Sequence, residues 1–482
     1  MSQDMEALYQ ARLRRFVTAL NNRKPDRVPI RPLVAEFTGR HAGYTCQQLT
    51  QHYPDAFEAM IQSSRDYDWD AVPASMVYVW TGITDAATVT YYGVPGVDIP
   101  PDAGFQYREP PEDASFMHED EYDRLIDDPV AFLYEVWLPR ATRKIAAAGE
   151  PVTFRHNVSL VSAAMAMTEY FNAFGPHTAR LRSEAGMPGA IAGIFKAPFD
   201  IIADKLRGYI GLTMDMHTQP EKVLKACEAL MPHLYWVAAT TADPASQMPI
   251  GYWMHRGCVP FVRPDQFTSH YWPTVKPVIE ELWRNGHQTM FYAEGNWDAH
   301  LDAFHELPER SIVYHMDRGT PLLTHRTLHD KFALSGGVSN VTLAFGTPEQ
   351  VRQEVRTLIE TVGRDGGYIM DASAIMQNDT TPENMRAMVE ATREFGDYDA
   401  PDVLPEPLRV APDSIAGAAS PPAKTAGPPA TTGRQPGVSV SWEEHRAELA
   451  GPIQGSEELA KRVWEAADAN GAMFIWQMLL SF

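Results

Sequence analysis

Apolar residues in this chain recur in short runs that are bounded by turn-forming residues and separated by longer segments with helical spacing. Short buried strands are expected at 28–34, 71–73, 152–154, 289–292, 311–314, 332–335 and 368–370. Helical spacing of apolar residues is found in 7–21, 220–239, 264–285 and 348–362. Strands that alternate with helices predict a parallel α/β fold, and in the last third of the chain the repeat has the length of one βα unit, roughly 30 residues.

Two stretches interrupt this alternation. Residues 84–128 are rich in Gly, Pro, Asp and Glu and show little periodicity, which predicts an insertion or long loop over one end of a barrel. Residues 411–437 are dominated by Ala, Pro, Gly, Ser and Thr, a composition typical of a linker. The chain is therefore expected to consist of a barrel over 1–405, the linker, and a helical tail over 438–482 that docks on the barrel or on a partner subunit.

The composition narrows the range of partners. The chain has 482 residues, of which 44% are hydrophobic, so there is ample material for a large core. Its formal net charge of −21 argues against a nucleic-acid or anionic-membrane partner, because such surfaces require a positive field. The chain has three cysteines and no leader-like start, which predicts a cytoplasmic protein. No apolar run approaches the roughly 20 residues that a membrane span requires, so no span is expected.

The first candidate site residues follow an apolar stretch that ends at Met254. His255 offers a general acid or base, or a metal ligand, and Arg256 offers a two-pronged donor for a carboxylate or phosphate. Residues at a strand end open onto the mouth of a barrel, where barrel enzymes carry their chemistry. The alternative is that Arg256 pairs with a core carboxylate while His255 caps a helix.

A second group of candidates ends the predicted strand 289–292. It consists of Tyr292, Glu294 and Asn296, with Gly295 allowing a ligand or backbone to approach closely. Glu294 can serve as a general base, as a metal ligand or as the partner of a cationic substrate. The alternative is an ion pair between Glu294 and a neighbouring arginine such as Arg256.

Two further pairs complete the set of candidates. His315 and Asp317 end the next predicted strand, and they can act as a base with its orienting acid or belong to a loop network. Arg40 and His41 form a basic pair in the loop after the first strand, which suits an anion. Motifs for nucleotide binding, zinc proteases or Cys-x-x-Cys sites do not occur in a supporting context.

Eight short segments, in this order along the chain, carry a family resemblance. They are Arg15-Phe16, Pro25-Asp26-Arg27-Val28-Pro29, Ala197-Pro198-Phe199-Asp200, Leu206-Arg207-Gly208, Ala293-Glu294-Gly295, Ser335-Gly336-Gly337-Val338, Phe345-Gly346-Thr347-Pro348-Glu349 and Thr381-Pro382-Glu383-Asn384. The chain resembles the uroporphyrinogen decarboxylase superfamily over roughly residues 10–400. The resemblance implies a (β/α)8 TIM barrel with its site at the C-terminal ends of the strands, here with a long insertion and a C-terminal helical extension.

The chain departs from both chemistries of that superfamily. Uroporphyrinogen decarboxylases have an essential Asp where residues 74–80 contain no acid, and Arg40-His41-Ala42-Gly43-Tyr44 matches their Arg-Gln-Ala-Gly-Arg signature only in part. The corrinoid- and thiol-linked methyltransferases bind zinc through a His-x-Cys pair and a late Cys. Tyr292 and Glu294 stand at that pair, and residues 371–375 lack a cysteine. The thiolate motif is thus absent, and a zinc site here needs Glu294 and His255 as ligands.

The resemblance favours a methyltransferase-like enzyme that demethylates a small methoxy or methylated substrate and passes the methyl group to a corrinoid (cobalamin) carried by a partner protein. The catalytic residues are then expected to be Glu294, His255 and Tyr292, and the substrate-binding residues Arg256, Arg40, His41, Asn296 and Asp317. A homodimer is expected from the habit of the superfamily.

Two alternatives remain open from the sequence. One is a decarboxylase of a tetrapyrrole (uroporphyrinogen) or another acidic substrate, which predicts a positive pocket floor made of Arg31, Arg40, Arg155 and Arg256. The other is a non-catalytic barrel that binds a corrinoid or a partner protein through its tail.

Overall fold

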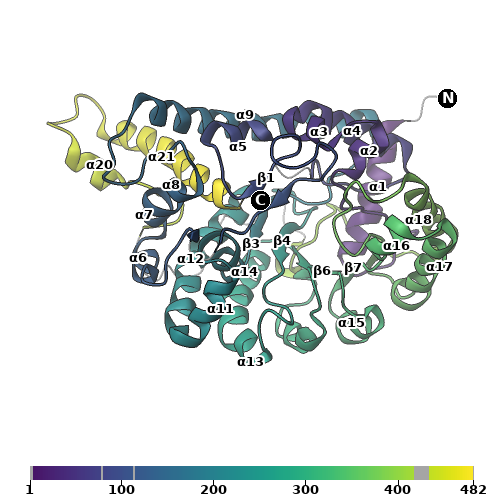
Figure 1. Ribbon diagram of the computed structural model, residues 1–482. Coiled ribbons are helices and arrows are strands. Elements are labelled where there is room, and N and C mark those ends of the chain that lie inside the picture. Colours follow the sequence, from purple (N-terminus) through teal and green to yellow (C-terminus); the bar gives the residue numbers. More distant parts are fainter. Residues whose placement is uncertain (1–3, 77–79, 112–113, 417–433, 481–482) are drawn as a thin grey trace.

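The protein is built around a closed barrel of eight parallel strand segments (Figure 1). The structure is a computed structural model that describes residues 4–76, 80–111, 114–416 and 434–480. Six strands form one parallel sheet in chain order. They are β3 (Ile194–Lys196), β4 (Ile250–Met254), β5 (Thr289–Ala293), β6 (Ile312–Met316), β7 (Ala333–Gly336) and β8 (Tyr368–Ile369).

Two irregular segments close the barrel between β8 and β3. Ile30 pairs in parallel with Met370, just beyond β8, and Val72 pairs in parallel with Gly189, ahead of β3. The backbone N–H of Asp70 donates to the carbonyl of Ile30 at 2.8 Å, which joins the two segments to each other. These segments are the predicted strands at 28–34 and 71–73, so the predicted (β/α)8 barrel is confirmed.

The barrel is wrapped by helices, and proline stands in the first turn of many of them, where its fixed φ suits a helix start. The four helices predicted from the spacing of apolar residues are confirmed. The longer elements are α1 (Met5–Leu20), α4 (Tyr53–Asp66), α9 (Phe154–Ala185), α11 (Tyr209–Thr218), α12 (Pro220–Thr241), α14 (Trp272–Arg284), α15 (Pro321–Leu328), α17 (Pro348–Leu358), α18 (Pro382–Phe395), α21 (Glu457–Leu480) and the 3-10 segment η5 (Asp298–Glu306).

Short helices and single π-helical turns fill the connections. The short α-helices are α2 (Phe37–Ala42), α3 (Cys46–Gln51), α5 (Thr81–Ala87), α6 (Tyr122–Asp127), α7 (Pro129–Phe132), α8 (Leu138–Ala141), α10 (Pro198–Ile201), α13 (Pro264–Gln266), α16 (Asn340–Phe345), α19 (Asp413–Ala416) and α20 (Trp442–Glu448). The π-helical turns are η2 (Leu133–Trp137), η3 (Ile202–Leu206), η4 (Phe267–Tyr271) and η6 (Ile359–Gly363). Among the described helices, none combines the length and the apolar character needed to cross a membrane.

The strand predicted at 152–154 is wrong, because this segment begins a helix instead. Thr153 caps α9, and its hydroxyl accepts from the backbone N–H of His156. The apolar side chains that suggested a buried strand face solvent, with Phe154 74% exposed. A short apolar run therefore marked the outer face of a 32-residue helix rather than a place in the barrel wall.

The structure places the insertion at 84–128 across the C-terminal end of the barrel. Its two short strands, β1 (Tyr92–Gly93) and β2 (Gln106–Tyr107), form an antiparallel pair. The insertion contacts loops that follow two different barrel strands: the N–H of Phe105 donates to Glu36, and Asn378 donates to the carbonyl of Asp102. Burial raises the pKa of Glu36 to about 7.

The described part of the tail packs against this insertion and against α12 (Figure 1). Tyr91 donates to the carbonyl of Met478 at 3.1 Å, and the ring of Trp476 stacks on His233 at 4.9 Å. Ser441 caps α20 in the capping box expected from the sequence. Most of the predicted linker, residues 417–433, and the last two residues of the predicted tail lie outside the described residues.

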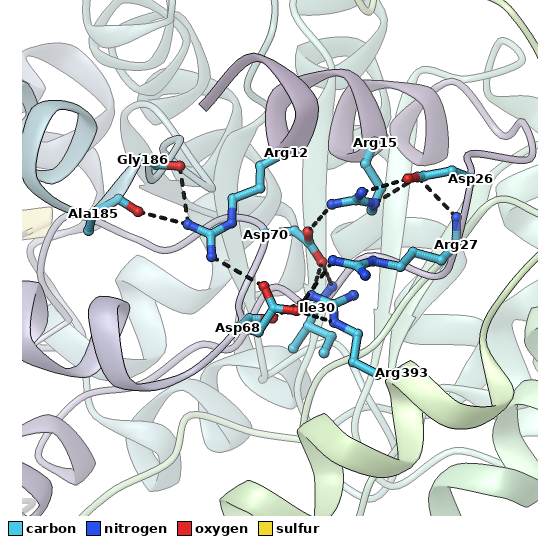
Figure 2. Close-up of polar contacts among 10 residues, drawn as sticks. All are labelled: Arg12, Arg15, Asp26, Arg27, Ile30, Asp68, Asp70, Ala185, Gly186 and Arg393. Carbon is cyan, nitrogen blue, oxygen red and sulfur yellow. Dashed lines mark hydrogen bonds and ion pairs between the residues drawn. The ribbon is translucent and has the colours of Figure 1, made fainter. Parts of the chain in front are cut away.

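Charged side chains at the N-terminal end of the barrel tie the first two strand segments to the surrounding helices (Figure 2). We call this group the N-terminal cluster; its members are Arg12, Arg15, Asp26, Arg27, Asp68, Asp70 and Arg393. Asp70 is fully buried at its centre, accepts from Arg15 and Arg393, and also accepts from the backbone N–H of Ile30.

Candidate active site

Neighbouring strands β4, β5 and β6 end at the same level at the C-terminal end of the barrel. Met254 pairs with Ala293, and Ala293 pairs with Met316, so the residues that follow them are His255, Glu294 and Asp317. The register thus brings three of the predicted site residues to adjacent positions on one rim. Glu294 is exposed there, while burial and the charge of Glu294 raise the pKa of Asp317, which accepts from the N–H of Gly295.

His255 and Arg256 share one buried carboxylate, that of Asp204 on η3. The imidazole Nε2 lies 2.5 Å from one Asp204 oxygen, and Arg256 Nε donates to the other at 2.8 Å. Burial works against the charge of both groups, but the mutual attraction outweighs it: the pKa of His255 is raised, and that of Asp204 is lowered. This arrangement favours the ionic form of the pair, an imidazolium on a carboxylate.

Asp200 braces the same corner from the helix that follows β3. Its Oδ1 accepts from the backbone N–H groups of His255 and Arg256 at 2.9 and 2.7 Å, and its Oδ2 accepts from the hydroxyl of Tyr271 at 2.7 Å. The His255 Nδ1 lies 3.6 Å from Asp200 Oδ1, without a hydrogen bond among the described residues. Asp200 therefore fixes the turn after β4 and places a second carboxylate within ion-pair distance of His255 Nδ1.

Two cations stand beside the His255–Asp204 pair. The guanidinium of Arg256 lies over the rings of Tyr209 and Phe261, 5.3 and 4.9 Å from their centroids. Within the described residues its Nη groups donate no hydrogen bond. Lys196, the last residue of β3, has its Nζ 3.8 Å from Asp204. We call Lys196, Asp200, Asp204, His255 and Arg256 the rim cluster.

The rim cluster is accessible, because the His255 and Arg256 side chains keep 20% and 16% of their surface exposed. An anionic group can reach Nη atoms of Arg256 that the described protein leaves free. The cluster can therefore bind an anion and offer a proton at one place.

Tyr292 and His315 lie below this rim, inside the barrel. Both are buried, and their rings stack at 4.8 Å. The Tyr292 hydroxyl accepts from the N–H of Ile375 at 3.1 Å, and His315 Nε2 lies 3.0 Å from the carbonyl of Ser373. His315 and Asp317 are thus separated: one side chain lies in the barrel interior and the other on the rim.

A buried arginine joins this interior network. Arg31 donates to Ser335, lies 3.2 Å from His315 Nδ1, and pairs with Asp371 at 3.2 Å. Burial raises the pKa of Asp371 to about 7, against the opposing charge of Arg31. These groups contact one another in the barrel core, where Arg31 Nε and Asp371 Oδ2 make no hydrogen bond among the described residues. None of the contacts among them reaches the rim cluster.

The remaining predicted residues point to other partners. Arg40 donates to the carbonyls of three successive residues, 378–380, after β8. His41 pairs with Asp66 at 2.8 Å. The side chain of Asn296 accepts from the N–H of Asp298. The structure does not bring Arg40, His41 or Asn296 into contact with the rim cluster within the described residues.

The sequence reasoning missed Lys196, Asp200 and Asp204. Strand β3 has only three residues and was not predicted, so the residues after it were not considered as a strand end. The usable signal was Pro198 after a short apolar run, followed by acids four residues apart, which share one face of a helix.

The donor set of the rim cluster does not fit a metal ion. Asp200, Asp204 and His255 have donor atoms within 4.8 Å of one another, and Glu294 does not join this group. The oxygens of both aspartates already accept from N–H, O–H or cationic groups, and Lys196 and Arg256 supply the compensating charge. Burial raises the pKa of Cys258 to about 11, and its thiol donates to the carbonyl of His255 at 3.2 Å.

Comparisons with known proteins match parts of the chain. A family model described as uroporphyrinogen decarboxylase (URO-D) matches residues 144–395, which include the whole rim cluster. Proteins named uroporphyrinogen decarboxylase from Pseudoalteromonas translucida and Methylococcus capsulatus are 36% identical over 70 residues and 38% identical over 66 residues, each stretch being 14% of this chain. The chain spans about a fifth of the length of these curated relatives, 20% and 19%.

A solved structure described as a methyltransferase from Methanosarcina mazei shares the fold. Its TM-score is 0.51 at 14% sequence identity, and the likeness covers 80% of this chain and 98% of that one. This agreement is one of architecture.

Proposed function

Because this chain belongs to the uroporphyrinogen decarboxylase family, we propose that it is a methyltransferase-like enzyme of that family acting on a small, negatively charged substrate. It removes a methyl group from a methoxy or similarly methylated compound and passes it to a corrinoid carried by a partner protein. His255 is the proton donor, and Arg256 with Lys196 holds the anionic group of the substrate.

The observation that carries the proposal is the His255–Asp204 pair at an accessible strand end. Loss of a methyl group from oxygen requires a proton, because an alkoxide is a poor leaving group. A histidine whose pKa is raised by a buried carboxylate keeps its proton to a higher pH than a free imidazole does and can supply that proton from Nδ1. The Nε2 bond to Asp204 fixes the orientation of the ring.

The proton and electron balance of the step is simple. The carbon–oxygen bond breaks with its electron pair on oxygen, and the oxygen takes the proton of His255. The methyl group bonds to an electron pair of the acceptor. Arg256 and Lys196 hold the carboxylate of the substrate, and the aromatic rings of Tyr209 and Phe261 keep the guanidinium of Arg256 in place.

The surface beside the rim cluster fits an apolar acceptor. Ile210, Met214 and Val259, which lie close in sequence to Tyr209 and Phe261, are 59%, 55% and 41% exposed. A corrinoid bound there would supply the nucleophile for the methyl group. Because the rim donors do not fit zinc, the proposed step uses no zinc ion bound by the rim cluster.

Glu294, Asp317 and Tyr292 keep supporting roles in this proposal. Glu294 adds negative charge next to His255 and so helps to hold its proton. Asp317 fixes the glycine turn after Glu294. Tyr292 anchors the loop after β8 through the N–H of Ile375.

Decarboxylation of an acidic substrate is the second candidate, supported by the family and by the same two cations, Arg256 and Lys196. The predicted floor of four arginines is nevertheless wrong. Arg31 pairs with Asp371, Arg40 is bound to backbone carbonyls, and Arg155 is exposed on α9. The site therefore suits one or two carboxylates rather than the many of a uroporphyrinogen.

The test uses probe compounds of matched shape. The protein is incubated with reduced cobalamin and either a methoxybenzoate or the neutral methoxytoluene of the same substitution. Methylated cobalamin from the carboxylate alone supports the proposal, and the signal should be lost in His255→Asn. Release of carbon dioxide from the same acid would assign decarboxylation instead. Cobalamin binding without either product would mark a non-catalytic barrel.

A further inference from the structure

A second group of potential ligands lies at the opposite end of the barrel from the rim cluster. Helix α15 starts after β6 and returns toward the N-terminal end, where its last turns carry His325 and His329. Asp365 lies in the turn that leads into β8. We propose that His325, His329 and Asp365 form a zinc-binding site, independent of the proposed catalytic function.

The donor atoms already converge without a metal. The two histidines are four residues apart, so their rings project from the same face of α15. Their Nε2 atoms lie 4.0 and 3.7 Å from Asp365 Oδ2, and the three donor atoms lie within 4.8 Å of one another. The ligand–ligand separation in a tetrahedral zinc site is about 3.4 Å, so the donor atoms must move closer by roughly 0.3 to 1.4 Å to complete the geometry.

A second, independent observation is a polar atom that lacks a partner. The Nε2 of His325 is buried and, among the described residues, makes no hydrogen bond. A buried polar atom without a hydrogen bond is unfavourable in a folded protein. A metal ion between the rings would satisfy this nitrogen directly.

The carboxylate of Asp365 is also free to coordinate. Within the described part of the chain its contacts with charged groups are those with the two histidines, and it donates to or accepts from no other side chain. In the rim cluster, by contrast, every aspartate oxygen is already used. This difference separates a site that can accept a cation from one that is internally neutralised.

The donor set selects the class of metal. Two imidazoles and one carboxylate suit zinc, which takes nitrogen and oxygen ligands in tetrahedral geometry, and suit calcium and magnesium poorly. The side chains of His325, His329 and Asp365 keep 15%, 34% and 46% of their surface exposed, so an ion and a fourth ligand from water can reach the site.

Zinc at this position would join elements that are far apart in sequence. Asn22, after α1, donates to the carbonyl of His329 at 2.7 Å, and the N–H of Gly367 donates to the carbonyl of Arg23 at 3.0 Å. The site thus sits where α15, the turn before β8 and the chain after α1 meet. Binding there stabilises the folded state by an amount that grows with the logarithm of the free zinc concentration once it exceeds the dissociation constant.

The test measures zinc binding to metal-stripped full-length protein by equilibrium dialysis and follows the Tm with and without zinc chloride. The unaltered protein should retain zinc and melt at a higher temperature when zinc is present. His329→Ala and Asp365→Asn should each weaken the binding of this zinc ion by on the order of 100-fold and should abolish the increase in Tm. This is at least the effect of removing an outer-shell partner of a metal ligand, which weakens metal binding by about 10- to 100-fold.

A matched control comes from another histidine–aspartate pair. His52 lies 3.1 Å from Asp55 on an exposed helix start and belongs to no group of three ligands among the described residues. His52→Ala should bind zinc as the unaltered protein does. Far-ultraviolet circular dichroism checks that each variant folds. If a histidine variant does not fold, Asp365→Asn, at a half-exposed position, still decides the test.

The proposal is overturned if the unaltered protein retains no zinc. It is equally overturned if His329→Ala and Asp365→Asn bind zinc with unchanged affinity, or if the zinc is lost in Asp204→Asn, which would move the ion to the rim cluster.

Discussion

Two clusters of charged side chains stand at opposite ends of the same barrel, and they use similar residues in opposite ways. In the N-terminal cluster, Arg15 donates through all three of its nitrogens to Asp26 and Asp70 (Figure 2). In the rim cluster, Arg256 engages its carboxylate through Nε, and its outer nitrogens donate no hydrogen bond to the part of the chain that the structure describes. The first arrangement closes the barrel, while the second keeps donors available for a ligand.

The difference teaches where to look for function in this family. Arg15, Asp26 and Arg27 belong to the family-like segments of the chain, yet they lie at the end of the barrel that supports stability. Asp200 lies in another such segment and braces the rim. Membership in a family motif does not by itself separate structural residues from catalytic ones, whereas the use of their donors does.

The largest effect is expected from removing the proton donor of the rim cluster. His255→Asn should lower turnover by roughly 10²- to 10⁴-fold, which is the usual contribution of general acid catalysis. The Tm should not fall to a comparable extent. The measurement is the initial rate of methyl transfer together with a thermal melt. The exposed His305, changed to Asn, is the control, and equal losses in the two variants would count against a rim acid.

The opposite result, a loss of stability without a loss of activity, is expected from a substitution in the N-terminal cluster. Asp70→Asn removes a buried carboxylate that faces Arg15 and Arg393, so the free energy of unfolding should fall by about 3–5 kcal/mol. The rate per folded molecule should stay the same. Urea unfolding measures the loss, and Asp399→Asn, at an exposed position, is the control. An Asp70→Asn variant that stays stable but loses activity would contradict the structural role assigned to the N-terminal cluster.

A smaller effect is expected at the anion-binding arginine. Arg256→Lys keeps a positive charge but loses the planar group that lies over Tyr209 and Phe261. The KM for a methoxybenzoate should rise by about 10- to 100-fold, while kcat changes little, since the loss of one charged hydrogen bond is worth roughly 1.5–3 kcal/mol. An unchanged KM would remove Arg256 from substrate binding.

The smallest effect is expected at Glu294. This exposed carboxylate acts on His255 only through its charge, so Glu294→Gln should reduce turnover by a few-fold at most. Steady-state kinetics at low and high salt measure the effect. A loss as large as that of His255→Asn would make Glu294 the catalytic group, as the sequence alone suggested.

The sequence predicted the barrel because apolar runs and helical spacing are local properties of the chain. Strands β5 and β6 and helices α12 and α17 follow directly from those patterns. The strand at 152–154 was wrong because an apolar run does not reveal whether it faces a core or solvent, and β3 was missed because three residues give too short a pattern.

The candidate site could be predicted only in part, because the sequence shows which residues follow the strands but not which distant residues contact them. His255, Glu294 and Asp317 follow recognisable strands, so their common rim was within reach of the sequence. Their partners were not, because Asp204 reaches His255 from a helix 51 residues earlier. Tyr292 lies within β5 and is buried inside the barrel, whereas Glu294 comes after the end of the strand and is exposed. Residues two apart share a face only while the strand continues, so the sequence could not show that these two side chains separate.

The central claim is that Asp204 holds a proton on His255 at the mouth of the barrel, and it can be measured without a known substrate. The measurement is an NMR titration of the His255 imidazole in the unaltered protein and in Asp204→Asn. The raised pKa predicts a midpoint above the ordinary value of about 6.5, which falls when the carboxylate is removed. Turnover that needs the imidazolium should then be lost as pH rises through that midpoint, and at lower pH in the variant. A midpoint at or below 6.5 in the unaltered protein, or one that does not move in Asp204→Asn, would contradict the claim.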